Sequence, residues 1–268
     1  MSYLEHFGLR YAPFSKEIED SDLWLPPSKQ GLVDELVEAV EERSSGCLIG
    51  DPGVGKTSVL RALRQRLPQA GFRLTYCHNV TLGRRDFYRQ LCHALGISAA
   101  ADSGSVFRAV TAYVEDQSRE RVHPVFLLDE AQLLQQALLE HLHVLLNYEW
   151  DRRALLSVIL VGLPELEDRL QMRRNRSLYS RLHCRLSIDG HTPEDTADYI
   201  QYRLRKAGVK TEVFTSDAIA MLHEAALGSL RDVDRVATAA LKAASRKRRK
   251  LVERDLVERL LDADSPTP

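Results

Sequence analysis

Short strand-like runs and amphipathic stretches alternate along the first two thirds of the chain. The runs that predict strands are residues 47–49, 72–77, 125–128, 155–161 and 184–188. Helical patterns occupy residues 32–42, 58–67, 86–95, 106–117 and 133–148, and the small, polar stretch 98–105 predicts a loop. Strands that alternate with helices in this way predict a parallel sheet with helices on both faces.

The last third of the chain contains helical patterns only, at residues 193–206, 216–226, 233–246 and 253–261. The first of these begins at Thr192-Pro193-Glu194, with proline at the first helical position. The chain is therefore predicted to be of the α/β class. An N-terminal segment with the first helix (1–45) precedes an α/β core (46–190), a small all-helical lid (191–263) and a tail (264–268).

The loop that follows the run 47–49 reads Gly50-Asp-Pro-Gly-Val-Gly55-Lys56-Thr57, which fits the P-loop pattern. Glycines let backbone N–H groups turn toward phosphate oxygens, and the next helix points its positive end at the same anion. Lys56 is then placed to reach the β- and γ-phosphates, and the Thr57 hydroxyl to ligate Mg²⁺. A glycine-rich turn with a chance lysine is the alternative, and the strand before the loop and the helix after it argue against that alternative.

A second acidic motif, Asp129-Glu130-Ala131-Gln132, follows the buried run 125–128. A carboxylate at the carboxyl end of a parallel strand faces the crevice where nucleotide phosphates bind. Asp129 is therefore expected to hold Mg²⁺ through water, and Glu130 to orient and deprotonate the attacking water. Alternatively, both carboxylates merely cap the next helix. The residues expected to bind ATP are Gly50, Asp51, Pro52, Gly53, Val54, Gly55, Lys56, Thr57, Ser58 and Asp129.

Composition changes this picture little. Hydrophobic residues make up 44% and charged residues 28% of the 268 positions, which is ordinary for a globular protein. Apolar runs are too short for a membrane helix, and the first residues do not form a signal peptide. The four cysteines have no paired spacing, so reduced thiols and a cytoplasmic location without membrane attachment are expected.

Basic residues are balanced by acidic ones overall, 37 against 38, but they cluster in the second half of the chain. One run without an intervening acid consists of Arg169, Arg173, Arg174, Arg176, Arg181 and Arg185. A second cluster occupies residues 246–250. Such clusters either form solvated faces or supply phosphate contacts to nucleic acid without reading its sequence.

Several motifs together resemble the AAA+ ATPases, and among them the ExeA-like group that includes transposition ATPases of the MuB, IstB and TnsC kind. The similar segments are Tyr3-Leu-Glu-His-Phe7-Gly-Leu9 with Pro13-Phe14, the P-loop, Asp129-Glu-Ala-Gln132, Ile159-Leu-Val-Gly162-Leu-Pro-Glu-Leu166 and Gly228-Ser-Leu-Arg231. Their order covers nearly the whole chain. The resemblance implies a P-loop AAA+ core with a five-stranded parallel sheet, a helical lid, ATP and Mg²⁺ as ligands, and Arg231 reaching the γ-phosphate.

Two positions depart from the group's pattern. Leu163 stands where the group usually has a polar residue that helps to position water, which predicts slow or partner-dependent hydrolysis. The lid motif lacks the commoner proline before Arg231, so its turn is expected to be less fixed.

The resemblance also implies a homo-oligomer, a ring or a helical filament, in which a neighbour's arginine contacts the γ-phosphate. Arg181, just before the fifth predicted strand, fits this trans position best, and Arg176 is the next candidate. The alternative for both is the basic surface described above.

The sequence says less about the molecule on which the expected ATPase acts. The transmembrane helix and cell-wall-binding domain of ExeA-like secretion proteins are not found in this sequence, and a bare motor of this kind is typical of transposon-encoded regulators that bind duplex DNA and recruit a transposase. Arg84 and Arg85 are the candidate DNA contacts, or else two arginines in a solvated loop. A module that serves a secretion or envelope partner without binding DNA is the main alternative, and a poorly hydrolysing nucleotide switch is the other.

Overall fold

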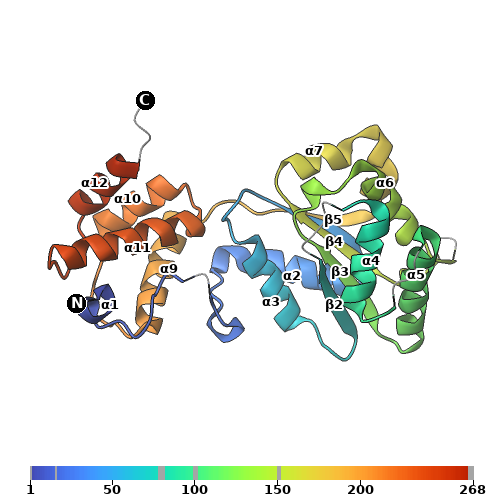
Figure 1. Cartoon of the computed structure of the whole chain (residues 1–268), viewed down its shortest axis with the longest axis horizontal. Coiled ribbons are helices and arrows are strands. Elements are labelled where there is room, and N and C mark those ends of the chain that lie inside the picture. The colour runs from blue at the N-terminus through green and yellow to red at the C-terminus, as the bar shows by residue number, and fades with distance from the viewer. Residues whose placement is uncertain (1, 16, 78–81, 99–101, 150–151, 265–268) are drawn as a thin grey trace. The chain divides into compact units, whose positions relative to one another are not determined.

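The computed structural model describes residues 2–15, 17–77, 82–98, 102–149 and 152–264. The chain divides into two compact units, coloured along the sequence in Figure 1. The sheet unit comprises residues 29–51 and 59–188, and the helical unit comprises residues 1–28, 52–58 and 189–268. Most of the loop of residues 50–57 thus belongs to the helical unit, whereas the strand before it belongs to the sheet unit.

Five parallel strands form one sheet in the order β2-β3-β4-β1-β5. Their bounds are β1 Ser45–Ile49, β2 Phe72–Cys77, β3 His123–Leu128, β4 Ser157–Gly162 and β5 Leu182–Ser187. This confirms the expected five-stranded parallel sheet. Because all strands run the same way, the residues that follow β1 and β3, Gly50 and Asp129, leave the sheet at the same edge.

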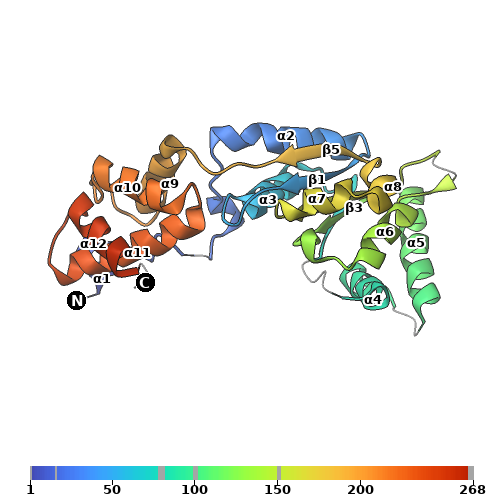
Figure 2. The same cartoon turned by 90° about the horizontal axis from the view of Figure 1, so that it is seen from above.

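The helices that lie wholly or mostly in the sheet unit are α2 Pro27–Glu41, α3 Lys56–Arg66, α4 Arg84–Leu95, α5 Ser103–Arg119, α6 Gln136–Leu145, α7 Glu165–Gln171 and α8 Arg176–Tyr179. Short 3₁₀ turns, η2 Ala131–Leu133 and η4 Arg173–Asn175, lie between them. Figure 2 shows α2 on one side of the sheet and α4, α5 and α6 on the other. Alternate strand residues such as Phe126, Leu128 and Leu160 are buried in the core beneath α4, α5 and α6.

Two predictions from the sequence are wrong in detail. The stretch 98–105 is not all loop, because the Asp102 side chain accepts a hydrogen bond from the Ser105 N–H and so starts α5 at Ser103; residues 99–101 lie outside the described residues. The helix expected over 133–148 is broken into η2 and α6. Leu134 and Gln135 have extended backbones between them, which interrupts the helical hydrogen bonding.

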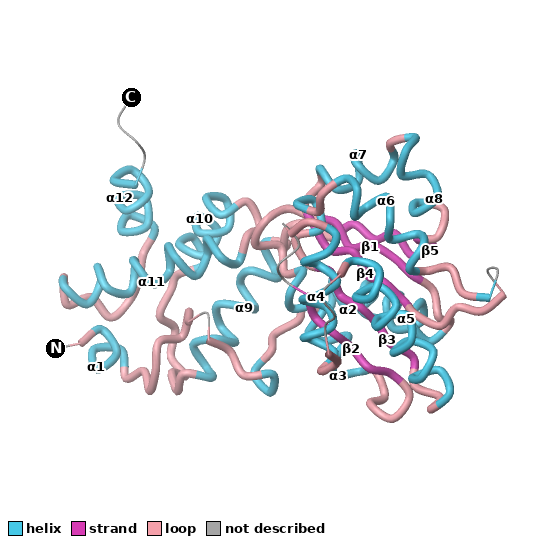
Figure 3. The backbone as a smooth tube through the Cα atoms, turned by 45° about the vertical axis from the view of Figure 1, so that its right-hand side comes forward, coloured by secondary structure: helices cyan, strands magenta, loops and turns pink. Residues whose placement is uncertain are grey.

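The helical unit contains α1 Tyr3–Phe7, the 3₁₀ turn η1 Asp20–Asp22, α9 Pro193–Lys206, α10 Ser216–Ala226, α11 Leu230–Arg246 and α12 Arg254–Asp264. All five strands belong to the sheet unit (Figure 3). Thr192 and Asp195 form a capping box at the start of α9. The N-terminal segment packs into this unit through Leu9 and Phe14, the latter with its ring centroid 6.2 Å from that of Phe214.

Candidate functional site

The loop of residues 50–57, which carries the P-loop motif, turns at two of its glycines. Gly53 and Gly55 have φ angles of 83° and 102°, which L side chains rarely adopt. A Cβ on Gly53 would lie 2.1 Å from the Ser229 Oγ, so glycine is also required there for close approach. Val54, between the two glycines, is buried.

Helix α3 begins at Lys56, directly after these glycines. Its first backbone N–H groups have no partner within the helix and carry the positive end of the helix dipole. Thr57, in the first turn, is exposed, and Lys56 is half-buried. The loop and the first turn therefore combine backbone donors, a cation and a hydroxyl, which together suit a polyphosphate.

The start of the lid helix α11 lies against the same loop, within the helical unit. The Leu230 N–H donates a hydrogen bond to the Gly53 carbonyl at 3.2 Å, and a Cβ on Gly53 would lie 3.4 Å from the Arg231 Cβ. Ser229 caps α11 by accepting a hydrogen bond from the Asp232 N–H. The turn that lacks the commoner proline is thus held by a serine cap, with the exposed Arg231 beside the loop.

In the sheet unit, Asp129 continues β3 by one residue, and its N–H donates to the Cys77 carbonyl at 3.0 Å. The carboxylate is buried and held at both oxygens. Its Oδ1 accepts from the Glu130 N–H at 2.9 Å and its Oδ2 from the Tyr76 hydroxyl at 2.6 Å. The sequence analysis missed Tyr76, because its proximity depends on the register of β2 against β3.

Tyr76 as a whole is 47% exposed, but partial desolvation of its phenol, and then the hydrogen bond to Asp129, raise the pKa of that phenol above its ordinary value. Tyr76 therefore remains a neutral donor at neutral pH. Each carboxylate oxygen of Asp129 accepts one of these hydrogen bonds and retains a second lone pair. The carboxylate is thus oriented while still able to accept from a metal-bound water.

Glu130 has an uncommon backbone, with φ 53° and ψ 37° in the left-handed region. Its side chain is exposed, and its Oε2 accepts a hydrogen bond from the Gln132 Nε2 at 2.7 Å. The expectation that the two carboxylates only cap the next helix gains no support, because neither makes a capping hydrogen bond to η2 or α6.

No group of three or more histidine, cysteine or acidic side chains that could hold a metal ion occurs among the described residues. At nucleotide sites Mg²⁺ generally takes one or two protein ligands together with phosphate oxygens and water. Thr57 and Asp129 remain the candidates for those protein ligands.

The candidate trans arginine, Arg181, immediately precedes β5 and is half-buried. Its Nη1 donates to the Ser177 carbonyl at 3.1 Å. It lines a pocket of about 330 Å³ at the amino ends of β1, β4 and β5, together with Arg43, Arg153 and His183. Arg176, the other candidate, is exposed at the start of α8.

The candidate DNA contacts, Arg84 and Arg85, are exposed at the first two positions of α4. Cations at a helix N-terminus are disfavoured by the helix dipole. The preceding residues 78–81 lie outside the described residues.

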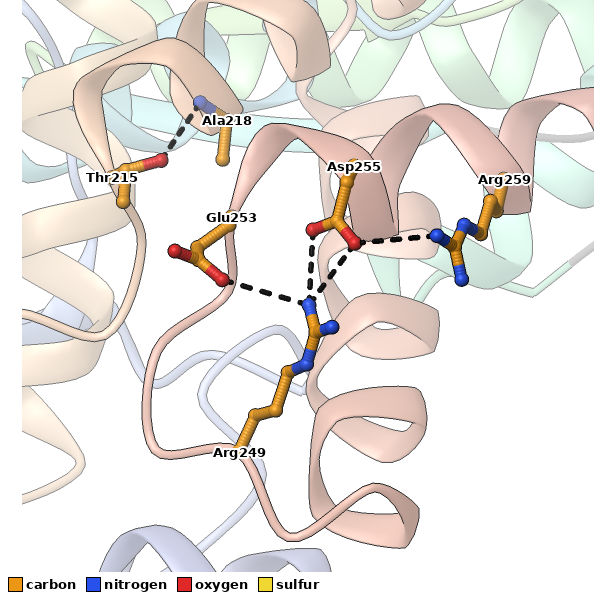
Figure 4. A network of polar contacts seen from close by, with 6 residues as sticks. All are labelled: Thr215, Ala218, Arg249, Glu253, Asp255 and Arg259. Carbon is orange, nitrogen blue, oxygen red and sulfur yellow. Dashed lines mark hydrogen bonds and ion pairs between the residues drawn. The ribbon is translucent and has the colours of Figure 1, made fainter.

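Several other arginines prove to serve the fold. Arg169 donates to the Gln132 and Leu134 carbonyls, and the Arg185 guanidinium lies 3.9 Å from the centre of the Tyr179 ring. In the cluster 246–250, Arg249 pairs with Glu253 at 3.5 Å and Asp255 at 3.0 Å (Figure 4).

The rest of that cluster divides between the fold and the surface. Lys250 donates to the His6 carbonyl, which ties the turn after α11 to α1. Arg246, Lys247 and Arg248 are exposed. Only these three members of the cluster are therefore candidates for contact with a partner.

Comparison with known proteins adds to this picture. Residues 38–170 match the family described as AAA domain. The chain is 30% identical to General secretion pathway protein A of Aeromonas hydrophila over 258 residues. This alignment covers 95% of the chain and 47% of that protein, so the chain spans about half the length of its curated relative.

Solved structures with a similar fold include Drosophila ORC bound to DNA, with a TM-score of 0.70 and 20% identity over 97% of this chain and 65% of that one. Cdc6p from Pyrobaculum aerophilum matches with a TM-score of 0.67 and 17% identity, over 88% of this chain and 68% of that one. At such identities the matches show the fold alone, and they confirm the α/β sheet followed by a helical region. Among the described residues, none of the helices has the length and apolar character needed to cross a membrane.

Proposed function

We propose that this chain, whose residues 38–170 match the family described as AAA domain, hydrolyses ATP to ADP and phosphate. The observation that carries the proposal is the pairing of two features. One is a loop with positive φ at Gly53 and Gly55 leading into a helix that begins at Lys56. The other is an oriented carboxylate, Asp129, next to Glu130 at the carboxyl edge of the parallel sheet that the loop leaves.

Each residue has a chemical role in this proposal. Backbone N–H groups of the loop and the Lys56 ammonium bind the phosphates, and Arg231 contacts the γ-phosphate from the lid. Thr57 and Asp129 would hold Mg²⁺, which when bound supplies positive charge to the phosphate oxygens. Glu130 accepts a proton from water as the water oxygen bonds to the γ-phosphorus. The bond from that phosphorus to the β–γ bridging oxygen breaks, and ADP leaves with its electron pair.

The proposed active form is a homo-oligomer in which Arg181 of one copy contacts the γ-phosphate held by the next. A half-buried arginine that lines a pocket with Arg43, Arg153 and His183 supports a role in anion contact. Arg176 is the alternative contributor.

The proposed partner of this ATPase is duplex DNA, bound without sequence preference, in a cytoplasmic complex that recruits or activates a transposase. Exposed arginines at the start of α4 and the exposed residues Arg246, Lys247 and Arg248 support contact with phosphates. Similarity of fold to Drosophila ORC, whose structure is bound to DNA, is compatible with it. The transposase rests on the resemblance to transposition ATPases alone.

A second candidate is an ATPase module that serves a secretion or envelope partner without binding DNA. The observation in its favour is the 30% identity to General secretion pathway protein A over 95% of this chain. Gel retardation of duplex DNA of unrelated sequence, with and without ATP, separates the two. Retention that depends on ATP supports the DNA partner, and no retention at low salt favours the secretion partner.

The ATPase proposal is tested by comparing Lys56→Ala with Lys210→Ala, a control at an exposed lysine of the helical unit. Lys56→Ala is expected to abolish ATP binding measured by calorimetry, whereas Lys210→Ala binds as the wild type does. Phosphate release is measured on the same preparations. ATP binding without phosphate release, alone or with DNA, would make the chain a nucleotide switch and contradict hydrolysis.

A further inference from the structure

The side chain of Gln132 bridges Glu130 and the end of β4. Its Nε2 donates to the Glu130 Oε2 at 2.7 Å, and its Oε1 accepts from the Leu163 N–H at 3.2 Å. The orientation of the amide follows from the partners, since a backbone N–H only donates and a carboxylate only accepts. The Gln132 amide thus presents an N–H to Glu130 from a fixed direction.

The main chain of Gln132 is held as well. The Arg169 side chain, from α7, donates to the Gln132 carbonyl and, at 2.7 Å, to the Leu134 carbonyl. Asn175 donates in turn to the Arg169 carbonyl at 2.6 Å. The turn that carries Gln132 is therefore anchored on α7, so its side chain is supported at the backbone as well as at its Oε1.

Gly162 makes room for this bridge. A Cβ at that position would lie 2.7 Å from the Gln132 Oε1, closer than a real Cβ approaches a neighbour. Any other residue would displace the amide from the Leu163 N–H. Because the Leu163 side chain has no polar atom, residue 163 forms hydrogen bonds through its main chain alone: its carbonyl accepts from the Leu166 N–H at 2.9 Å, and its N–H donates to Gln132.

Glu130 needs such support. Its backbone lies in the left-handed region, which is uncommon for glutamate, and its side chain is exposed. A free glutamate side chain samples several rotamers, and fixing one costs conformational entropy. A donor held in advance, such as the Gln132 amide, lowers that cost.

We infer that Gln132 is a positioning residue for Glu130, holding its Oε2 so that its Oε1 faces the attacking water. The inference rests on the proposed ATP hydrolysis and names the residue that places its base. It also changes the expectation drawn from Leu163, because the polar support comes from residue 132 through the main chain of residue 163.

The test compares Gln132→Leu with Gln171→Leu, a matched control at an exposed glutamine on α7. Gln132→Leu is expected to lower kcat about 10- to 100-fold with little change in the KM for ATP, because misplacement of the base affects the transition state and not binding. Gln171→Leu keeps the wild-type values. In a Glu130→Gln background, Gln132→Leu should cause no further loss, since a positioning residue acts only through the base.

Two measurements distinguish this role from a structural one. The melting temperature of Gln132→Leu should stay near that of the wild type, and hydrogen exchange at the Leu163 amide should become faster. An unchanged kcat in Gln132→Leu, or a loss that adds to that of Glu130→Gln, overturns the inference. A wild-type chain that hydrolyses no ATP overturns the proposed function and the positioning role with it, and the wild-type control alone reveals that failure.

Discussion

The Tyr76 hydroxyl donates a hydrogen bond to the Asp129 Oδ2 at 2.6 Å, joining a side chain on β2 to the carboxylate that ends β3. Strand pairing sets this contact, because Tyr76 lies opposite Leu127 and the Asp129 N–H donates to the Cys77 carbonyl. Main chain and side chain of β2 thus hold the proposed Mg²⁺ ligand together.

Tyr76→Phe removes the donor and leaves the ring. A hydrogen bond to a charged group contributes about 1.5–3 kcal/mol, so the Mg²⁺ concentration for half-maximal hydrolysis should rise at least about 10-fold. ATP binding without Mg²⁺ should not change. The control is Tyr113→Phe. The Tyr113 hydroxyl accepts a hydrogen bond from Arg73 at the other end of β2. Equal Mg²⁺ dependence in the two variants would contradict a role of Tyr76 at the metal.

Arg181→Ala should lower hydrolysis at least about 10-fold and leave ATP affinity intact, because a trans arginine stabilises the transition state across an interface. Mixing decides whether it acts in trans. Arg181→Ala subunits retain the nucleotide site, and Glu130→Gln subunits retain Arg181, so the mixture should regain activity that neither variant has alone. Arg176→Ala is the parallel test of the other candidate. Light scattering that shows a monomer at every ATP and DNA concentration would exclude trans catalysis.

The DNA contacts can be assigned by comparing two sets of substitutions. Replacing Arg84 and Arg85 with alanine should weaken ATP-dependent binding equally on all duplex sequences. It should also reduce the slope of log affinity against log salt by about 2, since each lost phosphate contact accounts for about 0.9.

The comparison variant replaces Arg246, Lys247 and Arg248 together. If this triple variant loses affinity for DNA and the variant at Arg84 and Arg85 does not, the surface that contacts DNA lies on the helical unit. Binding that differs between sequences would contradict contact with phosphates alone.

Stability should depend on Asp234, a residue of α11 that accepts a hydrogen bond from the Tyr199 hydroxyl at 2.7 Å. Burial raises its pKa to about 6, although Tyr199 and Arg203 act in the opposite direction. At pH values between the ordinary carboxyl pKa and about 6, Asp234 holds a proton in the folded chain that it has released in the unfolded chain. This group's contribution to the free energy of unfolding therefore falls as pH rises through that interval.

Asp234→Asn removes the titration. Its melting temperature relative to the wild type should rise by about 4–8 °C between pH 4 and pH 7, because a shift of about two pKa units corresponds to about 2–3 kcal/mol and about 1 kcal/mol changes the melting temperature of a chain of this size by about 2–4 °C. Thermal unfolding of both proteins at several pH values measures this difference in melting temperature. A difference that is constant with pH, or that falls as pH rises, would contradict the raised pKa of Asp234.

Local signals explain which features could be predicted from the sequence. The runs that became β1 and β3, the glycine-rich loop and the proline start of α9 are each encoded within a few neighbouring residues, so pattern alone located them. The contacts of Tyr76 and Gln132 could not be found in this way, because each joins residues from different strands or turns through register. The break between η2 and α6 was missed because Leu134 and Gln135 carry no helix-stopping signal.

The basic residues show the same limit. Arg169 and Arg249 look like their exposed neighbours in the sequence, yet one binds carbonyl groups and the other pairs with acids. Only the folded arrangement separates arginines that serve the fold from those left for a partner.

The proposed hydrolysis is tested most directly by single-turnover phosphate release from Glu130→Gln beside the wild type, with ATP binding measured on both. The substitution keeps size and a hydrogen-bonding group but removes the base. The account predicts equal ATP affinity, a stable ATP-bound oligomer, and phosphate release at least about 100-fold slower than in the wild type. Release from Glu130→Gln at the wild-type rate would contradict the assignment of Glu130 as the base.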